Sequence, residues 1–277
     1  MNEEETAAPE EAEESGPRGD RIAKYLSRAG IASRREIERM IAEGKIVLNG
    51  TPVTHPAVFV GPGDIVQVAG KVVDAPERTR LWRYHKPEGL VTTHRDPEDR
   101  PTIFQKMPPG MPRVISVGRL DLNSEGLLLL TNDGALARLL ELPATGWLRR
   151  YRVRVYGAVE PQALAALAQG VTVEGVRYGP IDAALDSRKG ENAWLTVALR
   201  EGRNREIRRV MRHLNLHVSR LIRLAYGPFQ LGQLPRGAVE EVPARVLRDQ
   251  LPAGTPTHGP TRDGKPSAAG RDAHHRR

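Results

Sequence analysis

The chain has 277 residues, which is enough for one catalytic domain of ordinary size and a smaller module. Its formal net charge is +8 at pH 7 although its first 20 residues are rich in glutamate, so the remainder is strongly basic and nucleic acid is the expected class of partner. The absence of cysteine excludes disulfides, a cysteine nucleophile and the usual structural zinc sites.

The two ends of the chain predict tails rather than folded structure. Residues 1–20 are acidic with no apolar run, and residues 253–277 are rich in glycine, proline, threonine, alanine and basic residues. Neither a signal peptide nor a membrane span is indicated, because the longest leucine run is only as long as a strand. We therefore expect a cytoplasmic protein with two disordered tails and no contact with membranes.

Residues 21–69 predict two short helices followed by a hairpin. Apolar residues share one helical face over residues 21–30, and Ser33 to Glu36 is a capping box that starts a second helix. The Asn-Gly pair at 49–50 predicts a tight hairpin turn. The basic residues that lie off the apolar faces are either a solvated surface or an RNA-binding face, and they are Lys24, Arg28, Arg34, Arg35 and Lys45.

Residues 70–80 are polar and contain a proline, as expected of a linker, and a second domain is predicted over residues 81–252. This domain begins with a strand that ends at the turn 86–89, Lys-Pro-Glu-Gly, to which no chemistry is assigned. Residues 171–178 are expected to form one strand. Near its end, Val242, Val246 and Leu247 are expected on one face of a helix.

The segment 118–126 is the first candidate for chemistry. It is a polar, glycine-bounded loop that leads into four leucines and an Asn-Asp-Gly turn, so a loop is expected to be carried on a buried strand. Asp121 lies between two leucines, where a carboxylate needs a cation or a shifted pKa. It is either a catalytic carboxylate or a turn-former that bonds its own backbone.

Two later segments are further candidates. The strand predicted at 149–155 alternates, with Tyr151 on its apolar face, where a tyrosine either packs in the core or contacts a ligand. A helix is predicted to begin at Arg203 with an apolar stripe that includes Ile207. Its density of arginine indicates either a solvated basic face or a site for anions.

Several of these segments, in this order, resemble one known family. The string Arg119-Leu120-Asp121 with the leucines after it, the strand carrying Tyr151 and the segments 202–209 and 218–228 resemble RNA pseudouridine synthases that modify ribosomal RNA. Residues 21–69 resemble the S4 RNA-binding domain. The resemblance covers residues 21 to about 250 and implies an α+β fold, with a small S4-like α/β domain followed by a catalytic domain that has a bent mixed β-sheet.

The resemblance also implies roles for particular residues. Asp121 would be the catalytic nucleophile, Tyr151 would pack against the target base and Arg208 would pair with Asp121. Leu224 would form an apolar wall beside the uracil. The remaining implied roles are substrate binding by Arg119, Arg203, Arg205 and Arg223, and RNA binding by Lys24, Arg28, Arg34, Arg35 and Lys45, of which Arg34 and Arg35 would contact phosphates.

The reaction implied by the resemblance converts a uridine to pseudouridine in folded ribosomal RNA, without a metal or other cofactor. Asp121 could attack C1′ or help to expel the uracil, and both remain open. The loop 96–102, the start of the second S4 helix and the basic tail are most similar to the large-subunit pseudouridine synthase B group, so a single uridine of 23S rRNA is the expected target of a monomeric enzyme.

Three alternatives are weighed against this prediction. A target in 16S rRNA would leave the chemistry unchanged, and a non-catalytic RNA-binding assembly factor would use the S4 domain alone. A glycoside hydrolase could pair Asp121 with Glu125. The basic charge and the small share of aromatic residues, 4%, which leaves little surface for stacking on sugars, argue against that last possibility.

Overall fold

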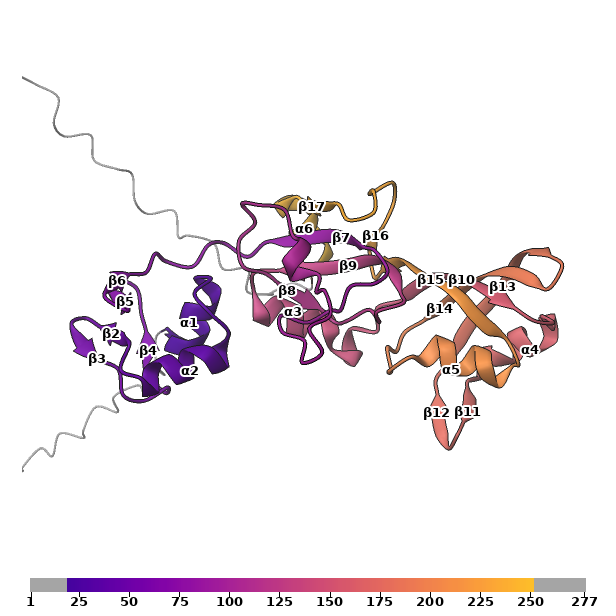
Figure 1. Ribbon diagram of the computed structural model, residues 1–277, viewed down its shortest axis with the longest axis horizontal. Helices are drawn as coiled ribbons and strands as arrows, with labels where there is room; N and C mark the ends of the chain where they lie inside the picture. Colours follow the sequence, from indigo (N-terminus) through magenta and orange to yellow (C-terminus); the bar gives the residue numbers. More distant parts are fainter. Residues whose placement is uncertain (1–18, 252–277) are drawn as a thin grey trace, which may run out of the picture.

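The computed structural model describes residues 19–251, and both predicted tails fall almost entirely outside these residues. A small N-terminal unit lies at one end of the chain's long axis, and a larger domain follows it (Figure 1). No helix within residues 19–251 is long and apolar enough to cross a membrane.

The N-terminal unit has the predicted helix–helix–hairpin order. Ser33 Oγ accepts a hydrogen bond from the backbone N–H of Glu36 at 3.2 Å, and Asn49 and Gly50 both have positive φ angles, as the predicted turn requires. Ile22, Leu26 and other apolar residues form a separate small core. The elements are β1 (Asp20–Arg21), α1 (Ile22–Arg28), α2 (Arg34–Ala42), β2 (Ile46–Leu48), β3 (Thr51–Pro52), β4 (Phe59–Val60), β5 (Val66–Val68) and β6 (Lys71–Val72).

The segment predicted as a linker is partly structured. Strand β6 pairs with β5, so the S4-like sheet extends into the first residues of the segment 70–80. At its other end, Thr79 is buried and its hydroxyl donates to the Asp133 carboxylate at 2.7 Å. Only the middle of this segment connects the two units without pairing to either sheet.

The larger domain is built on one mixed sheet with the strand order β13-β14-β10-β15-β9-β7-β17, to which β8 and β16 add at β9 and β15. All pairs are antiparallel except β15 with β9, which confirms a mixed sheet. The strands are β7 (Leu81–Lys86), β8 (Ile115–Val117), β9 (Glu125–Thr131), β10 (Arg149–Tyr156), β13 (Ile181–Lys189), β14 (Asn192–Leu199), β15 (His217–Tyr226), β16 (Phe229–Gln230) and β17 (Val239–Glu241).

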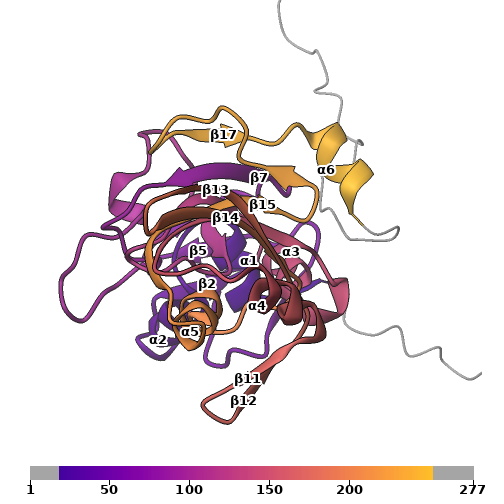
Figure 2. The same cartoon turned by 90° about the vertical axis from the view of Figure 1, so that its right-hand side faces the viewer.

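Strand β9 is buried on both faces and supplies both cores of this domain. Leu128 and Leu130 join the core beneath α5, while Leu127 and Leu129 point to the other face, where α3 and α6 pack. Figure 2 shows α4 and α5 on one side of the sheet, with α6 away from them near β17. The helices are α3 (Gly134–Glu141), α4 (Pro161–Ala166), α5 (Glu206–His213) and α6 (Ala244–Gln250), with short 3-10 turns η1 (Phe104–Lys106), η2 (Pro143–Thr145) and η3 (Leu167–Gln169).

Two predictions in this domain are wrong in detail. Residues 171–178 form a hairpin of β11 (Val171–Val173) and β12 (Val176–Tyr178), because the chain reverses at Glu174 and Gly175, which both have positive φ. In the C-terminal helix, Leu247 is buried but Val246 is 43% exposed, so these two neighbours do not share the buried face.

Candidate active site

A cleft of about 270 Å³ opens where the ends of β10, β14 and β15 meet two loops. One is the aspartate loop, residues 118–124, between β8 and β9, and the other is the arginine loop, residues 200–205, between β14 and α5. Both contribute side chains to the cleft. Its volume lies near the lower end of the range for ligand sites, so it admits a group the size of a nucleobase rather than a folded RNA.

Asp121 lines this cleft, and its side chain is 31% exposed. Its backbone carbonyl accepts from the N–H of Ser124 at 3.0 Å, which closes the turn of the aspartate loop. The carboxylate Oδ2 lies 3.4 Å from Nη1 of Arg205. The prediction that Arg208 makes this ion pair is therefore wrong, since Arg205 makes it.

The physical reason is the start of α5. The helix begins at Glu206 rather than Arg203, because Arg205 adopts a left-handed conformation with φ of 51°. This turn directs the arginine loop across the cleft toward Asp121. Arg203 and Arg205 consequently lie before the helix, while Arg208 lies within it.

Arg208 instead lines the cleft and braces the aspartate loop through its backbone. Its guanidinium donates to the carbonyl oxygens of Asn123 at 2.6 Å and Val218 at 3.1 Å. Burial, reinforced by the charge of Arg205, lowers the pKa of Arg208, and the charge of Asp121 opposes that shift. Arg208 therefore holds the backbone beside Asp121 and interacts with its carboxylate only through space.

Lys86 is a functional residue that the sequence reasoning missed, since the turn 86–89 was given no chemistry. Its side chain is fully buried, and Nζ donates to the carbonyl oxygens of Ser124 at 2.8 Å, Pro87 at 3.0 Å and Asp121 at 3.1 Å. Burial lowers the pKa of Lys86 to about 8, with the charge of Asp121 opposing the shift. A buried ammonium at the end of β7 thus fixes the aspartate loop.

Thr92 holds the same loop one residue before Asp121. Its hydroxyl donates to the carbonyl of Leu120 at 2.9 Å and accepts from the backbone N–H of Leu120 at 3.4 Å. The aspartate loop is therefore anchored by buried donors on both sides of its carboxylate. For Lys86, the signal in the sequence was its position in phase with Trp82 and Tyr84 on the buried face of strand β7, where a lysine needs partners.

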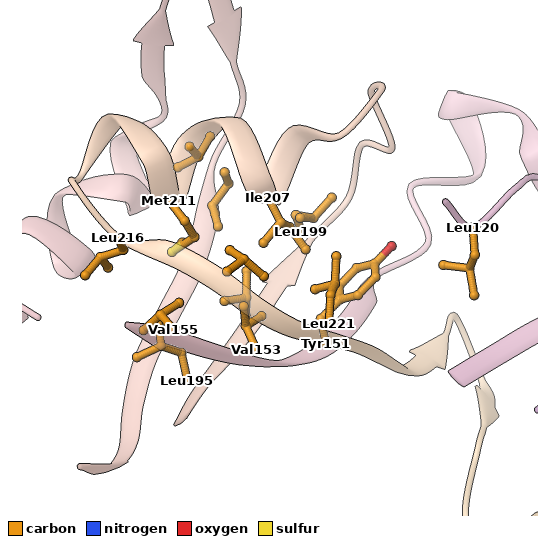
Figure 3. Packing of buried hydrophobic residues seen from close by; sticks show 14 of the residues in the cluster. Leu120, Tyr151, Val153, Val155, Leu195, Leu199, Ile207, Met211, Leu216 and Leu221 are labelled. Carbon is orange, nitrogen blue, oxygen red and sulfur yellow. The ribbon is translucent and has the colours of Figure 1, made fainter. Parts of the chain in front are cut away.

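Tyr151 and Leu221 form the apolar wall of the cleft. Both are buried and line it, and Figure 3 shows the Tyr151 ring beside Leu221 with its hydroxyl directed toward Leu120. The wall predicted at Leu224 is wrong, because Leu224 packs against the core on the opposite face of the sheet. Side chains alternate along β15, so a residue three positions further along the strand faces the other side.

The predicted substrate-binding arginines gather at the cleft. Arg119, Arg203 and Arg223 all line it together with Arg205. Arg223 is buried and its Nε donates to the carbonyl of Leu127 at 2.7 Å. A Cβ at Gly126 would lie 2.4 Å from the backbone oxygen of Arg223, so the parallel pairing of β9 with β15 requires glycine there.

Glu125 does not form the acid pair that a glycoside hydrolase would need. Its carboxylate is fully buried and hydrogen-bonded by the guanidinium groups of Arg220 and Arg236, and it does not line the cleft with Asp121. Burial alone would raise its pKa, but the two arginines outweigh burial and the pKa is lowered. A carboxylate held ionised in this way is unsuited to act as a general acid.

The five predicted RNA-binding residues of the N-terminal unit fall into two groups. Arg34 and Arg35, at the start of α2, are exposed and form no ion pair within residues 19–251. The other three are ion-paired: Lys24 with Asp20 at 2.7 Å, Arg28 with Asp20 at 3.2 Å and Asp133 at 3.8 Å, and Lys45 with Glu43 at 2.6 Å.

Arg28 in particular is not a solvated charge. Its side chain is only 9% exposed, and its partner Asp133 belongs to the larger domain, where it caps α3. This arginine therefore ties the N-terminal unit to the larger domain. Over the same described part of the chain, no group of three or more histidine, aspartate or glutamate residues is placed to hold a metal ion.

Two family models and several known proteins are similar in sequence to this chain. The family model for RNA pseudouridylate synthase matches residues 80–213, and the S4 domain model matches residues 20–66. An uncharacterized RNA pseudouridine synthase of Rickettsia felis is 44% identical over 227 residues, which covers 82% of this chain and 98% of the relative. Ribosomal large subunit pseudouridine synthase B of Haemophilus influenzae is 42% identical over 252 residues, covering 86% of this chain and 70% of the relative.

A solved structure shows the same fold. The crystal structure of a pseudouridylate synthase superposes with a TM-score of 0.58 at 24% identity, and the match covers 83% of this chain and 99% of that one. The family model and the relatives indicate a pseudouridine synthase, and the solved structure has the same fold. The relatives align along most of the chain. The chain therefore belongs to the RNA pseudouridine synthase family and carries an S4 RNA-binding domain ahead of its catalytic domain.

Proposed function

We propose that this enzyme converts one uridine of 23S ribosomal RNA to pseudouridine. The observation that carries this proposal is the position of Asp121 on an anchored loop, at the wall of a cleft of nucleobase size that Tyr151 also lines. Relatives named ribosomal large subunit pseudouridine synthase B, from three bacteria, are 41–42% identical to it. Their name supports the large-subunit RNA as the substrate.

The chemistry requires the target nucleotide to leave the RNA stack, because the N1–C1′ bond cannot be approached within a helix. The flipped uracil would pack against Tyr151 and Leu221, with its sugar toward Asp121. The N1–C1′ bond breaks, the ring turns and C5 bonds to C1′, after which C5 loses its proton and N1 gains one. The ring must therefore stay bound in the cleft throughout.

Asp121 must be ionised for either of its possible roles, attack on C1′ or assistance to the departing uracil. Arg205 lies 3.4 Å from its carboxylate and supplies a counter-charge there. Lys86 and Arg208 would act as positioning residues, since their contacts are with the backbone of the aspartate loop. The anchored loop would present the carboxylate without a cost of ordering at the moment of reaction.

The N-terminal unit would hold the RNA while the cleft receives one nucleotide. Arg34 and Arg35 combine free positive charge with the start of a helix, where backbone N–H groups also face outward, so both suit phosphate groups. Lys24, Arg28 and Lys45 are weaker candidates because acidic neighbours already neutralise them. Residues 81–252 would form the catalytic domain.

We also infer that the enzyme acts as a monomer in the cytoplasm, where ribosomal RNA is available. Sedimentation of the free protein and of its RNA complex tests this point, and a stable dimer under both conditions would contradict it.

The target is tested by mapping pseudouridines in ribosomal RNA with carbodiimide treatment and reverse transcription, in a strain that lacks this protein. One pseudouridine should disappear from 23S rRNA and return when the wild-type protein is supplied, but not when Asp121→Asn is supplied. Loss of a modification from 16S rRNA, with 23S rRNA unchanged, would move the target to the small subunit. An unchanged map in both RNAs would contradict the proposal.

A further inference from the structure

Among residues 19–251, the cleft holds most of the buried polar side-chain atoms that have no hydrogen-bond partner. Within residues 19–251 five such side-chain atoms occur, and four of them belong to cleft-lining residues: Ser124 Oγ, Glu206 Oε1, Arg208 Nε and Arg223 Nη2. Buried polar groups in folded proteins are normally partnered. Their concentration here indicates a cleft that receives a ligand with several polar atoms of its own.

Glu206 is the acidic member of this set and has no role in the mechanism described above. It is the first residue of α5, it lines the cleft together with Asp121 and Tyr151, and it is 3% exposed. Its Oε2 accepts from the backbone N–H of Arg203 at 2.9 Å. Its Oε1 is equally buried and accepts nothing from the described residues.

The charges around Glu206 do not compensate for its burial. Burial raises its pKa, the hydrogen bond from the backbone of Arg203 opposes this, and the charge of Glu201 adds to the increase. The guanidinium groups of Arg203 and Arg149 oppose it, but neither makes an ion pair with Glu206. The carboxyl therefore has no ion-pair partner among residues 19–251, and a ligand that donates a hydrogen bond to Oε1 would stabilise its charged form.

We propose that Oε1 of Glu206 accepts a hydrogen bond from N3–H of the flipped uracil and so makes the enzyme select uracil over cytosine. This inference rests on the proposed isomerisation of uridine. Enzymes that flip a base read it through its Watson–Crick edge. Uracil presents N3–H between two carbonyl oxygens, whereas N3 of cytosine carries a lone pair, which a carboxylate oxygen repels.

The other unpartnered atoms of the cleft are consistent with this arrangement. Arg223 Nη2 and Arg208 Nε are donors, and Ser124 Oγ can donate, so the cleft offers hydrogen-bond donors for the two carbonyl oxygens of uracil. Glu206 Oε1 alone among the four can serve only as an acceptor when ionised. It is therefore the atom of this set that distinguishes uracil, which has N3–H, from cytosine, which lacks it.

The test compares two RNA fragments that differ at one nucleotide, the uridine identified by the mapping experiment or a cytidine in its place. Dissociation constants are measured at one salt concentration for the wild-type enzyme, Glu206→Gln and Glu201→Gln. Glu201 is the matched control, because it lies in the neighbouring loop and both of its oxygens are already bonded, to Gly179 and Arg203.

The wild-type enzyme should bind the uridine fragment about tenfold more tightly or better. This ratio corresponds to the free energy of one hydrogen bond that forms with uracil and not with cytosine. In Glu206→Gln the preference should fall to about twofold or less. The amide oxygen can accept from the backbone N–H of Arg203, which leaves the amide N–H₂ facing the base, and that group cannot accept from N3–H of uracil. Glu201→Gln should keep the wild-type preference. Comparing ratios between proteins cancels any difference between the two RNAs themselves.

An unchanged preference in Glu206→Gln, or an equal loss in Glu201→Gln, would overturn the proposal. Should Glu206→Gln fail to fold, the wild-type enzyme still provides a test with 3-methyluridine at the target, where a methyl group replaces the N3 proton. Turnover of that RNA at the normal rate would overturn the proposal. Pseudouridine formation on the uridine fragment is followed in parallel, so failure of the proposed function is distinguished from failure of this contact.

Discussion

The aspartate loop and the arginine loop face each other across the cleft but are held in different ways. Buried groups anchor the aspartate loop, since Lys86, Thr92 and Arg208 all donate to its backbone carbonyls. In the arginine loop, the side chains of Arg203 and Arg205 are 51% and 42% exposed and pair with single carboxylates. One wall is held by buried hydrogen bonds, and the other carries exposed charges at the surface.

The difference follows from what each loop has to do. A reacting carboxylate needs a fixed position, and hydrogen bonds from charged donors are worth about 1.5–3 kcal/mol each when they are buried. Contacts with an RNA backbone need charge but little precision, and exposed ion pairs contribute about 0–1 kcal/mol to stability. We therefore expect substitutions behind the aspartate loop to affect folding and chemistry, and substitutions in the arginine loop to affect RNA binding or turnover with little effect on folding.

The largest effect is expected for Asp121→Asn. The amide keeps the shape of the side chain and removes its negative charge, so pseudouridine formation should fall to background while RNA affinity and thermal stability stay near wild type. Tritium release from C5 of the target uridine measures turnover, and filter binding measures affinity. Detectable turnover in this variant would remove Asp121 from the chemistry.

Lys86→Met should have the next largest effect. It leaves several buried carbonyls of the aspartate loop without their donor, and we expect a loss of about 3–5 kcal/mol in the free energy of unfolding together with a lower kcat. Urea unfolding and single-turnover kinetics measure the two effects. Lys106→Met, at an exposed lysine, is the matched control and should change neither.

Glu125→Gln should destabilise the start of β9, directly after the aspartate loop, by about 1.5–3 kcal/mol at neutral pH, because two charged hydrogen bonds weaken. The folded-state pKa of Glu125 lies below its ordinary value of 4.5, so its stabilising effect is present above that value and is lost as the pH falls through the lowered pKa.

Unfolding curves at several pH values test this direction of the pH dependence of stability. The gap in stability between wild type and Glu125→Gln should be constant from pH 7 to about pH 5 and should close below the ordinary glutamate pKa. A gap that widens on acidification would mean that the carboxyl is protonated in the folded protein.

The smallest effect on folding is expected in the arginine loop. Arg205→Gln should change stability by less than about 1 kcal/mol, since the ion pair with Asp121 is partly exposed, but it should reduce turnover. Arg212→Gln, in the exposed part of α5, should alter only the salt dependence of RNA binding. Equal losses of turnover in both variants would mean that the pairing of Arg205 with Asp121 has no special role.

Local patterns in the sequence were sufficient for most of the elements. Four local features appear as predicted: the cap at Ser33, the turn at Asn49 and Gly50, the leucine strand after Asp121 and the alternation along β10. Each depends only on residues that are close together in the sequence. The likeness of the motifs to one enzyme family likewise requires only their order. The family, Asp121, Tyr151 and most of the arginines that line the cleft could therefore be predicted from the sequence.

Which of those residues touch each other was decided by the tertiary structure. Asp121 and Arg205 are 84 positions apart, and their pairing depends on the left-handed turn that delays the start of α5. The choice of Leu221 over Leu224 depends on which face of β15 the cleft occupies. Lys86 acquires its role only because β7 pairs with β9 and brings its ammonium group beneath the aspartate loop. Such contacts join distant segments, so no local period in the sequence records them.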